Sequence, residues 1–211
     1  MTDDIGGSSG GFGEYPVVSL IKLFDECPSA DPVAPYQSRV REWATTYLSQ
    51  SHPELGREGP VCPFTATAIA RETFWLGCVD RSDLTAADIE KTMAGIILEF
   101  HRMQPTAGDG VLFKTILVLF PGVTDYTKID KAQQVLKEKS VPNGLMIGQF
   151  YPGCAAPGIR NSGFKPLQSP IPLLAIRHMV GSDLPFLTEK GEWVEEYLKR
   201  FTPPVTTLCG R

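Results

Sequence analysis

The sequence predicts a single α+β domain, with a central sheet of about four or five strands, mixed or antiparallel, covered by helices. Three observations support this fold class. The chain has 211 residues, of which 42% are hydrophobic, so one core can be buried. Segments with helical periodicity alternate with short apolar runs that are typical of strands. No apolar run leads into a dinucleotide, triphosphate or serine-hydrolase loop, and a doubly wound fold is disfavoured.

The N-terminal part of the chain predicts a tail followed by an amphipathic helix. Residues 1–14 are rich in Gly, Ser and Asp, so we expect a disordered tail ahead of a single domain over residues 15–211. The first helix is expected from Tyr36 to Gln50 and should pack through Trp43. Its apolar side chains recur at helical spacing: Val40, Trp43, Ala44, Tyr47 and Leu48.

The clearest helix of the sequence follows a predicted strand. Residues 73–79 are rich in aromatic and β-branched side chains, which favours a strand. Thr85 can act as the N-cap of the next helix, with Asp88 in its first turn, and the helix should end before Pro105. One apolar stripe runs along it, formed by Ile89, Met93, Ile96, Ile97, Phe100 and Met103.

The second half of the chain continues the alternation of helices and strands. The run from Val111 to Phe120 is too apolar for a strand with one solvated face, so it predicts a central strand that stops at Pro121-Gly122. Four elements are expected after it: a helix over about 127–139, strands over 145–150 and 171–180, and a final helix over 192–201.

Composition and charge exclude several classes of function. The net charge is −4 without a run of Lys or Arg, so we expect no nucleic-acid partner. No window approaches the roughly 20 apolar residues of a spanning helix, and the first residues do not resemble a secretory leader, so we expect a cytoplasmic protein. The five cysteines are odd in number and widely spaced, which indicates free thiols and no zinc site.

One stretch, from Gly144 to Leu187, concentrates the unusual chemistry of the chain. A short apolar strand runs into a loop crowded with Pro and Gly, and a second apolar run follows. That arrangement is typical of a pocket wall. Its candidate residues are Tyr151, Cys154, Arg160, Asn161, Arg177 and His178.

His178 is open to two interpretations. Strand alternation places it with Leu174 and Ile176 on one face, and Arg177 on the other. It is either a core histidine with a satisfied hydrogen bond or a ligand or proton donor on a rigid strand. A neutral imidazole amid apolar side chains is the ligand that a haem iron takes from a protein.

The remaining candidates also have two interpretations each. Cys154 lies in an irregular loop beside Gly, where a thiolate ligand to haem often lies, but it can equally be an ordinary loop thiol. Arg160 and Arg177 can bind haem propionates or a substrate carboxylate, or each can pair with a local carboxylate such as Asp183.

Several longer segments resemble known families. GPVCPFTATAIARETFWLG, FKTILVLFPG, GLMIGQFYPGC and PIPLLAIRHMVGSDLPFL together resemble an uncharacterised bacterial and fungal domain family associated with secondary-metabolite gene clusters, over about residues 15–205. The layout of Cys62-Pro63-Phe64, Phe120-Pro121, Gly148-Gln149-Phe150 and Arg160 is also similar to the YqcI/YcgG family of small haem proteins. That resemblance implies haem b and oxidative chemistry on nitrogen.

The leading hypothesis is therefore a haem-dependent enzyme that oxidises or couples nitrogen of an amino-acid-like small molecule. His178 would be the metal ligand, with Cys154 as the alternative, and Arg160 and Arg177 would bind propionates or a substrate carboxylate. Arg177, Tyr151 and His178 form the expected catalytic set. The substrate, a second copy of the chain in a homodimer and an electron-donor protein are the expected partners.

Two other hypotheses belong to different classes. In the first, the chain is a binding module without a cofactor, which holds a small apolar ligand or a partner protein under the loop over residues 151–170. His178, Tyr151 and Arg177 are then structural. In the second, His178 and Asp183 form an acid/base pair, provided that the chain turns at Gly181-Ser182.

Overall fold

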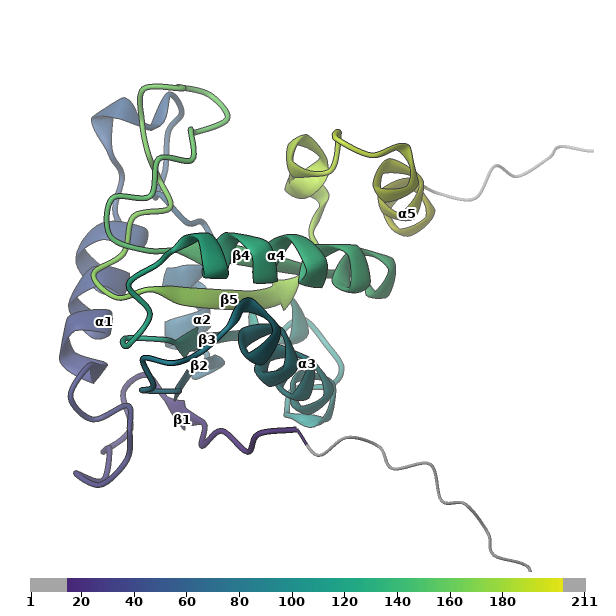
Figure 1. Ribbon diagram of the computed structural model, residues 1–211. Coiled ribbons are helices and arrows are strands. Elements are labelled where there is room, and N and C mark those ends of the chain that lie inside the picture. The colour runs from purple at the N-terminus through teal and green to yellow at the C-terminus, as the bar shows by residue number, and fades with distance from the viewer. Residues whose placement is uncertain (1–14, 203–211) are drawn as a thin grey trace, which may run out of the picture.

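The computed structural model describes residues 15–202, which form one mixed sheet with helices on both faces (Figure 1). The strands are β1 (Ile21–Lys22), β2 (Phe74–Cys78), β3 (Thr115–Leu119), β4 (Leu145–Phe150) and β5 (Leu173–His178), in the order β1-β2-β3-β5-β4. The predicted single-domain α+β fold with a mixed sheet is confirmed. The tail expected at residues 1–14 lies outside the described residues.

Three strands of the sheet share one direction. β2 and β3 are parallel, and β5 is antiparallel to both β3 and β4, so β4 runs parallel to β3. Parallel strands need long crossovers, and here these contain α3 (Ala86–Arg102) and α4 (Thr127–Ser140). The carboxyl ends of β2, β3 and β4 therefore meet at one edge of the sheet, which is where ligands commonly bind in open α/β sheets.

The core is divided in two by the sheet. One cluster packs under α3 and α4, and the other packs under α1 (Gln37–Trp43), its continuation η1 (Ala44–Leu48) and α2 (Thr65–Ala70) (Figure 1). In β3, Ile116 and Val118 belong to the first cluster, and Leu117 and Leu119 belong to the second. A strand that is buried on both faces explains why this run has no polar alternation.

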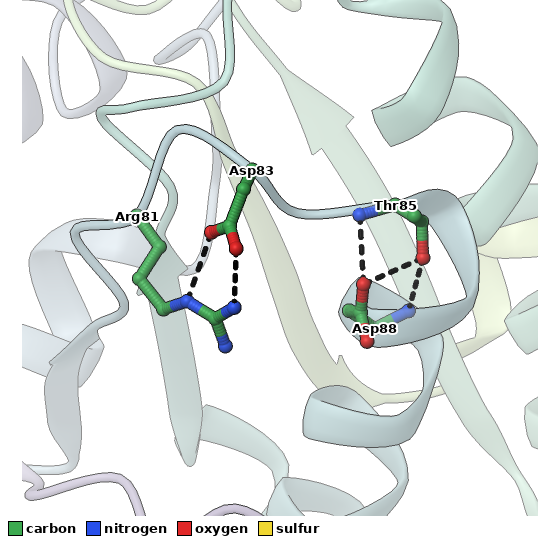
Figure 2. A network of polar contacts seen from close by, with 4 residues as sticks. All are labelled: Arg81, Asp83, Thr85 and Asp88. Atoms are coloured by element: carbon green, nitrogen blue, oxygen red, sulfur yellow. Dashed lines mark hydrogen bonds and ion pairs between the residues drawn. The ribbon is translucent and has the colours of Figure 1, made fainter.

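The start of α3 is fixed by the cap that the sequence predicts. Thr85 Oγ1 accepts a hydrogen bond from the Asp88 backbone N–H at 3.1 Å, and Asp88 Oδ2 accepts one from the Thr85 backbone N–H at 2.9 Å (Figure 2). This reciprocal pair is a capping box. Just before it, Arg81 and Asp83 form an exposed ion pair at 2.7 Å, also drawn in Figure 2.

The last helix forms a separate layer beside the sheet. α5 (Gly191–Phe201) follows η5 (Gly181–Phe186), and Trp193 of α5 packs into a small third cluster with Val141, Met146, Met179 and Leu187. Within residues 15–202 no helix is long and apolar enough to cross a membrane.

One predicted strand begins later than expected, and two short elements were not anticipated. Residues 111–113 form a short 3-10 turn, η3 (Val111–Phe113), instead of the beginning of β3, and Leu112 is exposed there. β1 and α2 were not anticipated, because two strand residues and six helical residues are too short to show a period. Two further short turns are η2 (Pro53–Leu55) and η4 (Val141–Asn143).

Candidate functional site

His178 lies at the end of β5, on the face covered by α3. Its ring centroid is 5.0 Å from that of Phe100, which is fully buried. Burial, together with the positive charges of Lys114, His101 and Arg200, lowers the pKa of His178 to about 4. The imidazole is therefore neutral near pH 7.

Lys114 is a neighbour of His178 that the sequence analysis missed. It is 2% exposed, and its Nζ donates hydrogen bonds to the carbonyl oxygens of Met103 at 2.8 Å and Pro105 at 3.0 Å. The same Nζ lies 4.6 Å from the Phe100 ring centroid. The sequence did contain a signal for this role, because Lys114 is the only charged residue in the apolar run over 111–120. Lys114 thus ties the chain after α3 to the start of β3.

Arg177 lies on the opposite face of the sheet from His178. Its Nη1 and Nη2 donate to the two carboxylate oxygens of Asp183, at 2.7 and 2.6 Å, and its guanidinium lies 5.2 Å from the Phe64 ring centroid. Asp183 also accepts from the Val180 backbone N–H at 2.8 Å. Both carboxylate oxygens are occupied, so Asp183 is a partner of Arg177 and not of His178.

Tyr151 and Cys154 occupy the two ends of one tight turn. The Tyr151 hydroxyl donates to Asp130 Oδ2 at 3.0 Å, and its ring stacks on Tyr126 with centroids 4.7 Å apart. Burial raises the pKa of Tyr151, and Cys154 and Asp130 add to the shift, so the phenol stays protonated. Cys154 itself has no exposed surface.

Arg160 lies further along the same loop and is exposed. A Cβ built on Gly56 would approach its Cβ to 3.0 Å, so the loop packs closely on η2. The next residue, Asn161, donates to the Glu54 carbonyl at 2.8 Å. Arg160 is therefore separated from the other candidates by the length of the loop.

The predicted haem residues do not converge on one site. A bound porphyrin needs an apolar cavity with one donor aimed into it. His178 packs against Phe100, Arg177 binds Asp183 on the other face, and two open grooves of about 580 and 570 Å³ are lined by other side chains. Within residues 15–202 no three His, Cys, Asp or Glu side chains are grouped to hold a metal ion. These residues therefore do not fit a haem.

The first of those grooves lies at the carboxyl end of β4. One wall is a single face of α1 and η1, formed by Arg39, Glu42, Trp43, Thr46 and Tyr47. The other wall is the loop after β4, through Pro152, Gly153 and residues 168–170. Trp43 was predicted in the core, but Arg39, Glu42 and Thr46 were not anticipated. Arg39 lies three and four residues before Glu42 and Trp43, and Thr46 lies four and three residues after them, so all four share one side of the helix.

A tight turn shapes the loop wall. The Cys154 backbone N–H donates to the Tyr151 carbonyl at 3.1 Å, with Pro152 and Gly153 between them. Gly153 has a φ of 72°, as the third position of a type II turn requires. A Cβ at Gly153 would meet no atom within 4 Å, so this position faces open space.

The helical wall contains an uncommon π-helical segment. In η1 the Ser49 backbone N–H donates to the Ala44 carbonyl, five residues earlier, at 3.0 Å. Such segments are rare among protein helices, but where they occur they often lie at functional sites. Two of its residues, Thr46 and Tyr47, line the groove.

Three side-chain donors fasten the two walls together. Trp43 Nε1 donates to the Gln168 carbonyl at 3.0 Å and Arg39 Nη2 to the Pro170 carbonyl at 3.0 Å. The Tyr47 hydroxyl donates to the Pro166 carbonyl at 3.4 Å. Bonds within the chain therefore hold the helix and the loop at a fixed separation.

A family profile described as a domain of unknown function, DUF6875, matches residues 37–209, which include both walls of the groove. No curated protein and no solved structure matches the chain. The expected resemblance to an uncharacterised domain family is confirmed, as a match to this domain of unknown function.

Proposed function

The chain belongs to the DUF6875 family, and from the geometry of its groove we propose that it is a binding module for a small molecule, which lies between α1–η1 and the loop after β4. The fastening of the two walls carries this proposal. Ligand sites are usually largely pre-formed and combine apolar surface with a few placed polar groups. The groove has both, because aromatic rings and ionisable side chains share its helical wall.

The position of the groove in the fold supports the same function. It lies where β4 ends, at the edge shared by the carboxyl ends of three strands with one direction. In open α/β sheets this edge is the common place for ligands, since the loops there can vary while the sheet remains fixed. The loop over residues 151–170, under which the binding-module hypothesis places the ligand, forms one wall of this groove.

A ligand screen on a groove-filling variant tests the proposal. Thermal unfolding would be followed for the wild type and Thr46→Trp in the presence of a library of small metabolites. Leu98→Trp, at an exposed position of α3, is the matched control. We expect ligands that raise the Tm of wild type and of Leu98→Trp but not of Thr46→Trp. A ligand that stabilises all three proteins equally would place the site elsewhere and overturn the proposal.

A further inference from the structure

The helical wall of the groove carries two opposite charges that do not pair with each other. Arg39 and Glu42 are one turn apart and both are exposed. Arg39 instead reaches the loop through its hydrogen bond to the Pro170 carbonyl. Among the ion pairs of residues 15–202, none contains either side chain. Each charge is thus available to a ligand.

From this pair we infer that the ligand is a small zwitterion of the amino-acid class, with a carboxylate on Arg39 and an ammonium on Glu42. This inference rests on the proposed function. A guanidinium has five N–H donors, and the Pro170 carbonyl uses one of them in Arg39. The others can bind a carboxylate in the paired geometry that makes such bonds strong. Glu42 offers two acceptor oxygens to an ammonium group.

The spacing of the two charges suits one small molecule. Residues three apart on a helix have Cβ atoms about 5–6 Å from each other, so their head groups can reach two charges on one ligand. The lining has one cation and one carboxylate, which disfavours phosphates and other polyanions, because Glu42 would repel them. A ligand with only one charge would leave one of the two side chains unused.

The body of the ligand would lie on carbon surface. Trp43 and Tyr47 already donate their polar hydrogens to the loop carbonyls of Gln168 and Pro166. Trp43 is a core residue with only 8% of its surface exposed, so the carbon surface at the groove comes mainly from the half-buried Tyr47 ring, against which an aromatic or aliphatic side chain can pack. Open space beside Gly153 leaves room on the facing wall.

Calorimetric titration of the full chain tests the inference. The probes are the twenty common amino acids and, for each one that binds, the amine without its carboxylate and the acid without its amine. For phenylalanine these are phenethylamine and 3-phenylpropionate. We expect the zwitterion to bind at least about tenfold tighter than either analogue, which is the effect of about 1.4 kcal/mol from one charged contact.

Variants of the two charges assign each contact. Arg39→Gln should remove the preference for the amino acid over its amine, and Glu42→Gln should remove the preference over its acid. Lys91→Gln and Glu99→Gln, at exposed positions of α3, make the same charge changes away from the groove and should bind as the wild type does.

The outcomes separate this inference from the proposed function. Suppose that an amine, an acid or an uncharged ligand binds as tightly as the zwitterion, and that Thr46→Trp abolishes this binding. The groove is then the binding site, but the inference of a zwitterionic ligand is wrong. If binding persists in Thr46→Trp, the groove itself is wrong. The absence of binding for all twenty amino acids at millimolar concentration also overturns the zwitterion.

Discussion

The guanidinium of Arg177 binds both carboxylate oxygens of Asp183, whose side chain is 1% exposed. These two residues were candidates for substrate binding and acid/base chemistry. They instead join the end of β5 to η5, because the five residues between them include the turn at Gly181. A pair with this geometry is a structural tie, and its energetic effect can be measured.

Removal of Asp183 should strongly destabilise the fold. Asp183→Ala leaves Arg177 partly buried without its partner, and the loss of one member of a buried pair costs about 3–5 kcal/mol. Urea unfolding would measure the change in the free energy of unfolding. Asp83→Ala, which breaks the exposed pair with Arg81 (Figure 2), is the control and should change it far less. Equal effects of the two substitutions would refute the structural role.

Stability should fall in mild acid because of His178. Its pKa is lowered from the ordinary value near 6.5 to about 4, so the unfolded chain binds the proton more readily than the folded one. The contribution of His178 is complete above about pH 6.5 and is lost as the pH falls toward 4. Urea midpoints across this range should decline less steeply in His178→Gln than in wild type. The same slope in His178→Gln and in wild type would contradict this account.

Lys114 should be required for stability and not for ligand binding. Lys114→Met leaves the carbonyls of Met103 and Pro105 without their donor, which should lower the free energy of unfolding by about 3 kcal/mol. Lys91→Met, on the exposed side of α3, should lie within about 0.5 kcal/mol of wild type. A stable Lys114→Met protein would contradict the proposed tie between α3 and β3.

Gly153 should be required in the turn beside the groove because of its positive φ, and not because a side chain would lack space there. Gly153→Ala should destabilise the protein by about 1–2 kcal/mol, because an alanine is strained at a φ of 72°. Gly191→Ala is a close control, since a Cβ there also meets nothing within 4 Å but the φ is not positive. It should be neutral or slightly stabilising at the start of α5. Chemical unfolding of both variants would compare them.

Haem binding can be tested by the colour of the protein. Because His178, Cys154, Arg160 and Arg177 lie in separate places, we expect no Soret band when haem is supplied to the purified chain. A band that disappears in His178→Ala would show that the histidine binds the iron, and the conclusion that these residues do not fit a haem would then be wrong.

The sequence predicted those features that depend on local patterns. The cap at Thr85 and the stripe of α3 are local, and β3 was recognisable as a strand with two buried faces. The groove was not predictable in the same way. Its walls are joined by bonds between residues more than a hundred positions apart, such as Trp43 and Gln168. No periodicity marks such a contact. The opposite faces of Arg177 and His178, by contrast, follow from strand alternation in β5 and were predicted.

The hydrogen bonds between the two walls of the groove determine which positions of the sequence can vary. The helix supplies side chains, but the loop supplies only main-chain carbonyls, at positions 166, 168 and 170. Every amino acid has such a carbonyl, so the side chains at these positions can be exchanged without loss of the fastening. Relatives with the same helix could therefore acquire different ligands through their loops, and a designer could alter the specificity of the groove by the same route.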